Sequence, residues 1–524
     1  MTAREADVLV IGGGMAAAWA AIAAARDGAS VILADKGYVG TSGVTATAGP
    51  GHWFVPPDRD LRAAAIRQRE SIAFGLADRL WMERILDETY RQLPTLADFY
   101  DFTVDDRGVT LYGPVRGPEY MRALRALAQQ LGVQLLDHSP ALELLQHTDG
   151  SIAGARGIHR QRPGAWVVRA AGTVLATGGC AFFSHLLGSR TNTGDGYLMA
   201  AEAGVELSGM EFTSQYTVAP AFSTMARSMS YAYATYYGPD LRPLDVPIHG
   251  DSTRVLARHL LAGPVYCDLA RMPRDIRERL PTISPNVLPP FNRLGIDPFV
   301  DKFPVTLIAE GTIRGMGGIR IDAADCQTSI PGLYAAGDAA SRELVTGASS
   351  GGGSVNSAWA LSSGYWAGRS AAARARTDGR RTQASAEPLG QAGIRPRRGG
   401  AALDSDEIIV AARHEATHYD KNLFRTHGKL SASLHVLDHL WREVRDHSRG
   451  GGADSLRARE AAAIVATARW SYCAALHRRE SRGMHQRDDA AAIVPEFGRR
   501  QTVAGLDQIR SSFSVTERRF GTSP

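Results

Sequence analysis

The stretch Val8–Ala17 reads VLVIGGGMAA, and an alanine-rich, uncharged run continues through 18–25 without a helix breaker. Four β-type residues therefore run through three glycines into a predicted helix. In a βαβ unit that binds a dinucleotide, Gly12 permits the tight turn, Gly14 lets the backbone approach a pyrophosphate, and Ala17 allows close packing of helix on strand. The N-terminus of the helix would offer free N–H groups to the phosphates. The pattern predicts a dinucleotide site that includes Gly12, Gly14 and Ala17.

A second predicted strand, residues 31–34, supplies the context that this motif needs. It ends at Asp35, about 20 positions beyond Gly14, where such units carry the acidic residue that accepts from the ribose hydroxyls. Asp35 and the adjacent Lys36 are therefore candidate cofactor-binding residues.

Two later glycine-rich turns decide between NAD and FAD. One β-type run ends in Thr177-Gly178-Gly179, and another, far downstream, ends in Gly337-Asp338. A compact NAD domain would end before the downstream strand, whereas the chain of FAD domains of this kind returns to the sheet after an insertion. We therefore expect FAD, with Thr177, Gly178 and Gly179 close to it and with Gly337 and Asp338 at its ribityl–phosphate region.

Length and composition divide the chain into domains. A chain of 524 residues exceeds a single core, which stops growing near roughly 250–300 residues. A proline-rich middle indicates an inserted domain, and helical spacing returns after a Gly-, Pro- and Arg-rich break, in 407–416, 430–444 and 455–475. The expected fold is α/β: an FAD-binding Rossmann-like domain (1–205 and 327–376), an inserted α+β capping domain (206–326), a linker (377–402) and a C-terminal helical domain (403–524).

Charge and cysteine content exclude several classes of protein. The net charge of +5 is mild, and the arginine clusters lack interleaved aromatic residues, so we expect no nucleic-acid partner. The mild positive charge is compatible with an anionic small-molecule substrate. The four cysteines form no Cys-x-x-Cys motif, which predicts no metal site. The uncharged run 8–25 contains the three glycines, so we expect no membrane insertion and a cytoplasmic protein.

Motifs spread over nearly the whole chain resemble one family, in sequence order. Besides the N-terminal motif and Thr177–Gly179, they are Thr193–Gly196, Met210–Phe212, Gly263–Leu269, Met316–Ile319, Gly332–Asp338 and Glu480–His485. On these residues the chain is identified as a member of the succinate dehydrogenase/fumarate reductase flavoprotein superfamily, which includes L-aspartate oxidase and the adenylylsulfate reductase flavoprotein. The resemblance implies an FAD-dependent oxidoreductase that transfers a hydride between flavin N5 and a small-molecule substrate.

The resemblance also implies further cofactor contacts. Asp195 would lie at the adenosine side of FAD, and Ser42 and Gly43 would lie under the isoalloxazine. The loop Gly351–Asn356, with Ser354, Val355 and Asn356, would open a long helix whose dipole faces the flavin. The segment 40–49 lacks the histidine that links FAD covalently in membrane-bound members, so we expect FAD (non-covalent). His52 lies past this segment and is expected to be a packing or surface residue.

Four elements that handle dicarboxylates in the superfamily are altered. Tyr216 stands at a histidine position, and 230–238 lacks the Arg-Gly-Glu-Gly-Gly loop. Ile313 stands at a second histidine position, and the arginine thought to deliver a proton to fumarate falls on Ser349 or Ser350. Serine cannot clamp a carboxylate bidentately. We therefore expect a substrate other than succinate.

Three catalytic candidates remain, each with a structural alternative. Arg254 and Arg314 lie beside family active-site positions and could bind an anion or form structural contacts, and Tyr216 could donate a proton or fill space. A tyrosine cluster in 231–237 is compatible with a pocket for a larger or less charged substrate, or with core packing. The segment Arg478–Arg482 is expected to form structural salt bridges between domains.

Three functions stay open at this point. The first is a dehydrogenase, reductase or oxidase of a non-succinate small molecule. The second is a succinate/fumarate flavoprotein subunit or an enzyme like L-aspartate oxidase. The third is a flavin electron-transfer subunit without its own substrate, and an electron-transfer protein partner is compatible with each of them.

Overall fold

The computed structural model describes residues 2–225, 229–248, 250–379, 385–398, 403–448 and 454–514. A mixed eight-stranded sheet lies at its centre, in the order β16-β6-β7-β8-β1-β2-β5, with β15 also paired to β8. These strands are β1 (Thr2–Ile11), β2 (Val31–Ala34), β5 (Gln134–Leu136), β6 (Ala141–His147), β7 (Ile152–Ile158), β8 (Ala165–Leu175), β15 (Leu333–Ala335) and β16 (Ala386–Pro388).

The middle of this sheet is parallel and buried on both faces. Val8 pairs with Val31 of β2, and β1 also runs parallel to β8. The downstream strand β15 joins the same sheet, where Leu333 pairs with Thr173 of β8. Covered parallel strands read as continuous apolar runs, which explains the sequence of β1 and β2. The prediction that a strand before Gly337-Asp338 returns to this sheet is confirmed by β15.

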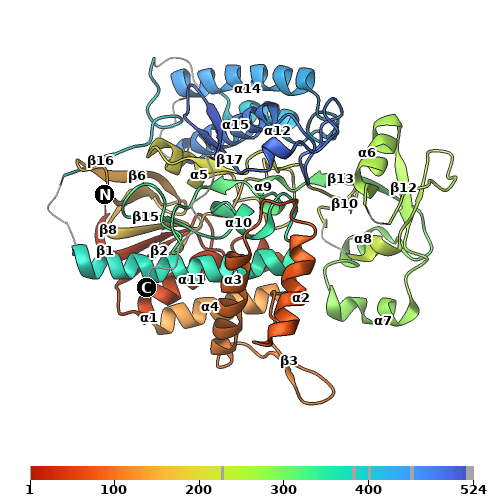
Figure 1. Ribbon diagram of the computed structural model, residues 1–524, viewed down its shortest axis with the longest axis horizontal. Coiled ribbons are helices and arrows are strands. Elements are labelled where there is room, and N and C mark those ends of the chain that lie inside the picture. The colour runs from red at the N-terminus through yellow and green to blue at the C-terminus, as the bar shows by residue number, and fades with distance from the viewer. Residues whose placement is uncertain are drawn as a thin grey trace.

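Helices α1 (Met15–Arg26) and α11 (Gly352–Asp378) pack side by side on one face of the sheet (Figure 1). A Cβ at Gly364 would lie 2.3 Å from the carbonyl oxygen of Ala16, and one at Gly368 would lie 2.0 Å from that of Ala20. These two glycines therefore allow the helix backbones to touch. Further helices of this part are α2 (Arg59–Glu70), α3 (Arg79–Gln92), α4 (Gly117–Gln130), α5 (Asp195–Glu202), α9 (Gly311–Arg314) and α10 (Glu343–Thr346).

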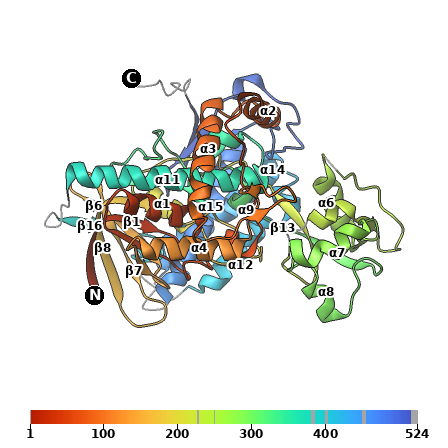
Figure 2. The ribbon, with the colours of Figure 1, turned by 90° about the horizontal axis from the view of Figure 1, so that it is seen from below.

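The inserted segment forms a second body with its own core, at one end of the molecule in both views (Figure 1, Figure 2). Its antiparallel sheet has the order β10-β13-β12-β11. The predicted α+β character is confirmed by this sheet and three helices, and the bounds 206–326 stay a prediction. The core contains residues from Tyr216 to Ala309 and, from the C-terminal part, Leu423 and Phe424. The elements are β10 (Tyr216–Pro220), β11 (Thr235–Tyr237), α6 (Ser252–Ala262), β12 (Val265–Asp268), α7 (Arg274–Ile283), α8 (Pro289–Leu294) and β13 (Phe303–Ala309).

The C-terminal part contains the three predicted long helices, α12 (Ser405–Thr417), α14 (His427–His447) and α15 (Asp454–His477). It also contains two strands that the sequence did not predict, β17 (Gln501–Ala504) and β18 (Arg510–Phe513). They join β9 (Leu207–Ser208) and β14 (Gly318–Ile319) in a four-stranded sheet. This shared sheet ties the C-terminal part to the residues that flank the insertion. Residues 380–384 and 399–402 of the predicted linker lie outside the described residues.

Buried ion pairs also connect the C-terminal part to the residues that flank the insertion. Arg478 Nε lies 2.7 Å from a carboxylate oxygen of Glu211, and its Nη1 lies 2.9 Å from Glu480. Arg482 Nε lies 2.6 Å from the same Glu480 oxygen. The side chains of Arg478, Glu211 and Glu480 are fully buried. The expected structural role of the segment 478–482 is confirmed.

Candidate cofactor and substrate site

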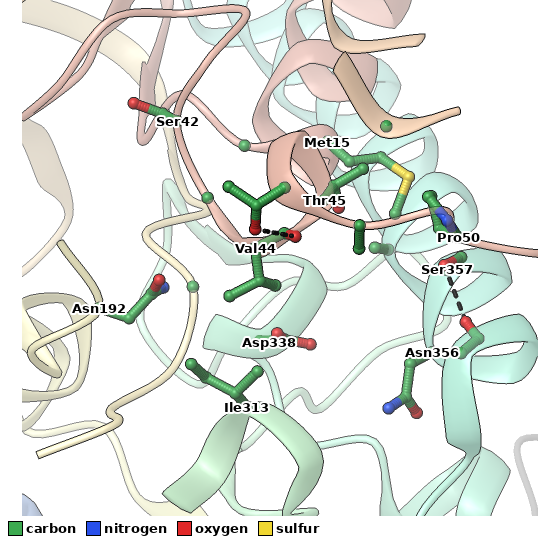
Figure 3. A pocket seen from close by; sticks show the side chains of 18 of the residues that line it. Met15, Ser42, Val44, Thr45, Pro50, Asn192, Ile313, Asp338, Asn356 and Ser357 are labelled. Atoms are coloured by element: carbon green, nitrogen blue, oxygen red, sulfur yellow. Dashed lines mark hydrogen bonds between the residues drawn. The ribbon is translucent and has the colours of Figure 1, made fainter. Parts of the chain in front are cut away.

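A cavity of about 770 Å³ lies at the carboxyl ends of β1, β2 and β8 and extends to the inserted domain. Open α/β sheets bind ligands at this edge of their strands. Most of the predicted cofactor residues line it: Gly12, Gly14, Asp35, Lys36, Ser42, Gly43, Thr177, Gly178, Asp195, Gly337, Asp338 and Asn356. The structure therefore brings together segments that are distant in the sequence, as Figure 3 shows for Ser42, Asp338 and Asn356.

The two key glycines of the first turn have different tasks. Gly12 has a φ of +121°, and a Cβ there would lie 2.2 Å from the carbonyl oxygen of Ala176. Gly14, the N-cap of α1, has an ordinary extended backbone, and a Cβ there would meet no other part of the protein within 4 Å. Gly12 is therefore required by the turn itself, whereas the absence of a side chain at Gly14 leaves room in the cavity.

Charged groups at the second strand are buried and paired. Burial raises the pKa of Asp35, and a hydrogen bond from the Ser42 hydroxyl opposes this shift. Lys36 Nζ lies 2.6 Å from Asp195 and 2.9 Å from Glu460 of α15. Burial disfavours the charge of Lys36, but Asp195 and Glu460 outweigh it and raise the pKa of the lysine. Glu460, from the C-terminal part, thus helps to hold Lys36 at the cavity wall.

Other parts of the cavity wall offer an open helix end and unpartnered polar atoms. A Cβ at Gly352 or Gly353, in the first turn of α11, would meet no other part of the protein within 4 Å. The buried amide oxygens of Asn192 and Asn356 accept no hydrogen bond from any described residue, and both residues line the cavity. These features fit a bound group with phosphate and polar ring atoms, which is the chemistry of FAD.

Four predicted cofactor residues do not line the cavity. Ala17 is fully buried in α1, and a Cβ at Gly179 would lie 2.4 Å from the hydroxyl of Thr312. Ser354 accepts a backbone hydrogen bond from Trp53 at 3.0 Å, and Val355 is buried. These residues support the walls. Sequence reasoning missed Asn192, although it directly precedes the Thr193–Gly196 motif.

Only one of the three catalytic candidates lies at the cavity. Arg314 lines it, and its Nε lies 3.3 Å from Glu310. Tyr216 is buried in the core of the inserted domain, where its hydroxyl donates to the carbonyl of Thr417 at 2.9 Å. Because its hydroxyl is also held by the amide of Asn422 at 3.1 Å, Tyr216 has a packing role here.

Arg254 is also directed away from the cavity. Its Nη1 donates to the carbonyl of Leu423 at 2.6 Å, and its Nη2 lies 2.5 Å from Asp488. Its guanidinium lies over the ring of Phe424. These contacts join the inserted domain to the C-terminal part. Arg254 was a candidate because it lies beside a family active-site position in the sequence. Adjacency in the sequence does not determine where a side chain points.

The described part of the cavity wall between β10 and β13 carries no charged side chain. The charged lining residue Arg314 follows β13, in α9. Apolar surface comes from Met225, Met272, Ile276, Leu280, Pro285 and Val287. Neutral polar groups come from Ser230, Tyr233, Thr282 and Asn286. Of the tyrosine cluster, Tyr233 alone is at the wall, and Tyr236 and Tyr237 belong to the sheet of the inserted domain.

Comparison with known proteins identifies the family. Residues 7–221 match the family described as FAD binding domain, and residues 414–508 match fumarate reductase flavoprotein C-term. L-aspartate oxidase of Mycobacterium bovis is 30% identical over 96% of this chain and 96% of its own length. The chain belongs to the succinate dehydrogenase/fumarate reductase flavoprotein superfamily. It is an FAD-dependent oxidoreductase.

Other members of the superfamily match over a similar length. One chain of the fumarate reductase (CoM/CoB) of Methanothermobacter marburgensis is 27% identical, over 94% of this chain and 96% of its own. The fold of a variant of E. coli quinol fumarate reductase FrdA superposes with a TM-score of 0.82, at 21% identity, covering 100% of this chain and 99% of that one. Within the described ranges, no helix is both long and apolar enough to cross a bilayer.

Proposed function

We propose that this flavoprotein oxidises or reduces a small molecule that is larger and less charged than succinate, bound between the FAD site and the inserted domain. The observation that carries the proposal is the pairing of every described cation at the cavity with a carboxylate. Lys36 pairs with Asp195 and Glu460, Arg116 with Glu119, and Arg314 with Glu310. Each of these cations already faces a carboxylate, so a bound dicarboxylate would have to compete for it, and burying an unpaired carboxylate is costly.

The neutral wall supports the same proposal. Its methionine, isoleucine, leucine and valine side chains match apolar substrate surface, and a few polar groups fix orientation, as is usual in small-molecule sites. Tyr233 and Asn286 can donate hydrogen bonds to a carbonyl or hydroxyl group of the substrate. Arg314 could accommodate one anionic group by exchanging its contact with Glu310.

Within this proposal, bound FAD supplies the hydride acceptor or donor, and the chain supplies position and polarity. Gly12 and Gly14 would hold the pyrophosphate, with Gly337 and Asp338 at the ribityl–phosphate region. Lys36 and Asp195 would lie at the adenosine side, and Asn192 and Asn356 would offer their free amide oxygens to polar hydrogens. The inserted domain would exclude water from the reacting atoms.

Non-covalent FAD is part of the proposal. His52 is buried, contacts the hydroxyl of Tyr120 at 3.3 Å, and is not among the residues that line the cavity. Burial lowers the pKa of His52 to about 4. A cytoplasmic location and an electron-transfer protein partner also remain proposals; the four unpaired cysteines are typical of a reducing compartment.

A titration with matched ligands tests the proposed substrate class. Each pair consists of a dicarboxylic acid and its neutral diester, and binding is followed by the change in flavin absorbance. We expect the diester to bind at least tenfold more tightly in each pair that binds. Arg314→Met should weaken monoanionic ligands, and Arg116→Met serves as the matched control. Tighter binding of the dicarboxylates would contradict the proposal.

L-aspartate oxidase activity is the second candidate, favoured by the 30% identity over 96% of both chains. It predicts that L-aspartate reduces the flavin anaerobically and that oxygen then restores it with formation of hydrogen peroxide. The proposed function predicts no reduction by L-aspartate. The same sample therefore separates the two candidates.

A further inference from the structure

Arg69, in the last turn of α2, is a buried arginine bound to a single loop. It is only 6% exposed. Its Nη1 donates to the carbonyl of Ser350 at 2.9 Å, and its Nη2 donates to the carbonyls of Thr346 and Ser349 at 2.7 and 2.8 Å. Nη2 also lies 2.9 Å from the hydroxyl of Ser349. The guanidinium therefore holds four acceptors within five consecutive residues.

Among the described residues, no ion pair compensates the charge of Arg69. Its described hydrogen bonds all go to neutral oxygen atoms, and its Nε has no partner. Burial lowers the pKa of Arg69 to about 10, so the side chain is still charged at neutral pH. An arginine with neutral partners thus adds net positive charge at this loop.

The loop leads directly into the cavity wall. The hydroxyl of Ser350 accepts a hydrogen bond from the backbone N–H of Gly352 at 3.3 Å. Gly352 and Gly353 line the cavity and begin α11, a helix of 27 residues. The positive end of the helix dipole lies at this N-terminus. Arg69 therefore acts on the cavity through Ser350, by fixing the residue whose hydroxyl accepts from the first N–H group of the helix.

We propose that Arg69 is a positioning residue of the flavin site, whose guanidinium, from α2, holds the Ser349–Ser350 loop. In the superfamily resemblance, an arginine falls on Ser349 or Ser350. Here the guanidinium of Arg69 holds the loop from the side of α2. Together with the N-terminus of α11, its positive charge stabilises negative charge on the reduced flavin. The inference rests on FAD occupying the cavity and not on the identity of the substrate.

Three variants test the inference: Arg69→Met, Arg69→Lys and, as a matched control on the same helix, the exposed Arg67→Met. Two readouts need no substrate. The first is hydrogen exchange of the segment 346–356, and the second is the midpoint potential of the bound flavin. A purely structural role would change stability without moving the potential.

For Arg69→Met we expect at least tenfold faster exchange in the segment 346–356. The reduction equilibrium should shift at least tenfold toward oxidised flavin, which is about 30 mV for a two-electron couple. For Arg69→Lys, exchange should still accelerate, because the fork of hydrogen bonds is lost, while the potential stays near that of the wild type.

The inference is overturned if Arg69→Met matches Arg67→Met in both readouts. If Arg69→Met does not fold, Arg69→Lys decides, and wild-type exchange in the segment 346–356 of that variant overturns the positioning role. Failure of the substrate proposal would leave both readouts unaffected, so the two outcomes are distinguishable.

Discussion

Separate substitutions of Gly12 and Gly14 in the first turn should have different effects, one on the stability of the fold and the other on the affinity for FAD. Gly12→Ala forces an L-residue to a φ of +121° and places its Cβ 2.2 Å from the carbonyl oxygen of Ala176. Backbone strain costs about 1–3 kcal/mol, and overpacking costs about 1–3 kcal/mol more. The free energy of unfolding of the apoprotein should therefore fall by about 2–6 kcal/mol, a large part of the stability of a typical domain.

Gly14→Ala should have the opposite profile. Its backbone, with φ −79° and ψ −175°, suits alanine, and exchanging glycine for alanine at an N-cap costs only about 1 kcal/mol. The new methyl group would enter the space where the pyrophosphate approaches the turn. An overpacking cost of about 1–3 kcal/mol there corresponds to FAD binding that is about 5- to 150-fold weaker.

The assay combines chemical denaturation of the apoproteins with FAD titration by fluorescence quenching. Gly428→Ala is the matched control, because a Cβ there also meets no other part of the protein within 4 Å and the residue lies in α14. Wild-type FAD affinity of Gly14→Ala would refute the placement of the cofactor. Wild-type stability of apo Gly12→Ala would refute the account of the turn.

Three further substitutions test the surroundings of the site. Tyr216→Phe should lower stability by about 1–3 kcal/mol, by loss of a buried hydrogen bond, and leave kcat unchanged in steady-state assays. Glu460→Gln should weaken FAD binding by about 1–3 kcal/mol, because buried Lys36 loses one carboxylate partner. The variant should then lose more FAD than the wild type on gel filtration. Burial, together with the charge of Glu211, raises the pKa of Glu343 to about 7, above its ordinary value of 4.5. Stability from this group is present below pH 4.5 and lost as the pH rises to 7, so Glu343→Gln should melt higher than the wild type at pH 8 and equally at pH 4. An equal difference at both pH values would contradict the assignment to Glu343.

The part of the cavity at the strand ends was predictable because its sequence signals are local. A turn such as 11–14 dictates its own glycines, and parallel strands bring their carboxyl ends to one edge, so Asp35, Thr177 and Asp338 meet without any knowledge of side-chain packing. Gly12 and Gly14 could even be assigned different tasks from the motif alone.

The substrate half depends on packing between distant segments, which the sequence does not display. Tyr216 and Arg254 stood near family positions, yet partners from residues 417–488 turn both side chains away from the cavity. Arg69 had no motif of its own and acquires its place only when α2 packs on the loop 346–350. The strands β17 and β18 were missed because four residues each give too short an alternation.

Anaerobic mixing of the photoreduced protein with fumarate tests the substrate proposal most directly, with the rate of return of flavin absorbance as the readout. The pairing of Lys36, Arg116 and Arg314 with carboxylates predicts that fumarate restores the absorbance no faster than buffer does. Rapid, saturable reoxidation by fumarate would contradict the proposal and assign the protein to dicarboxylate chemistry.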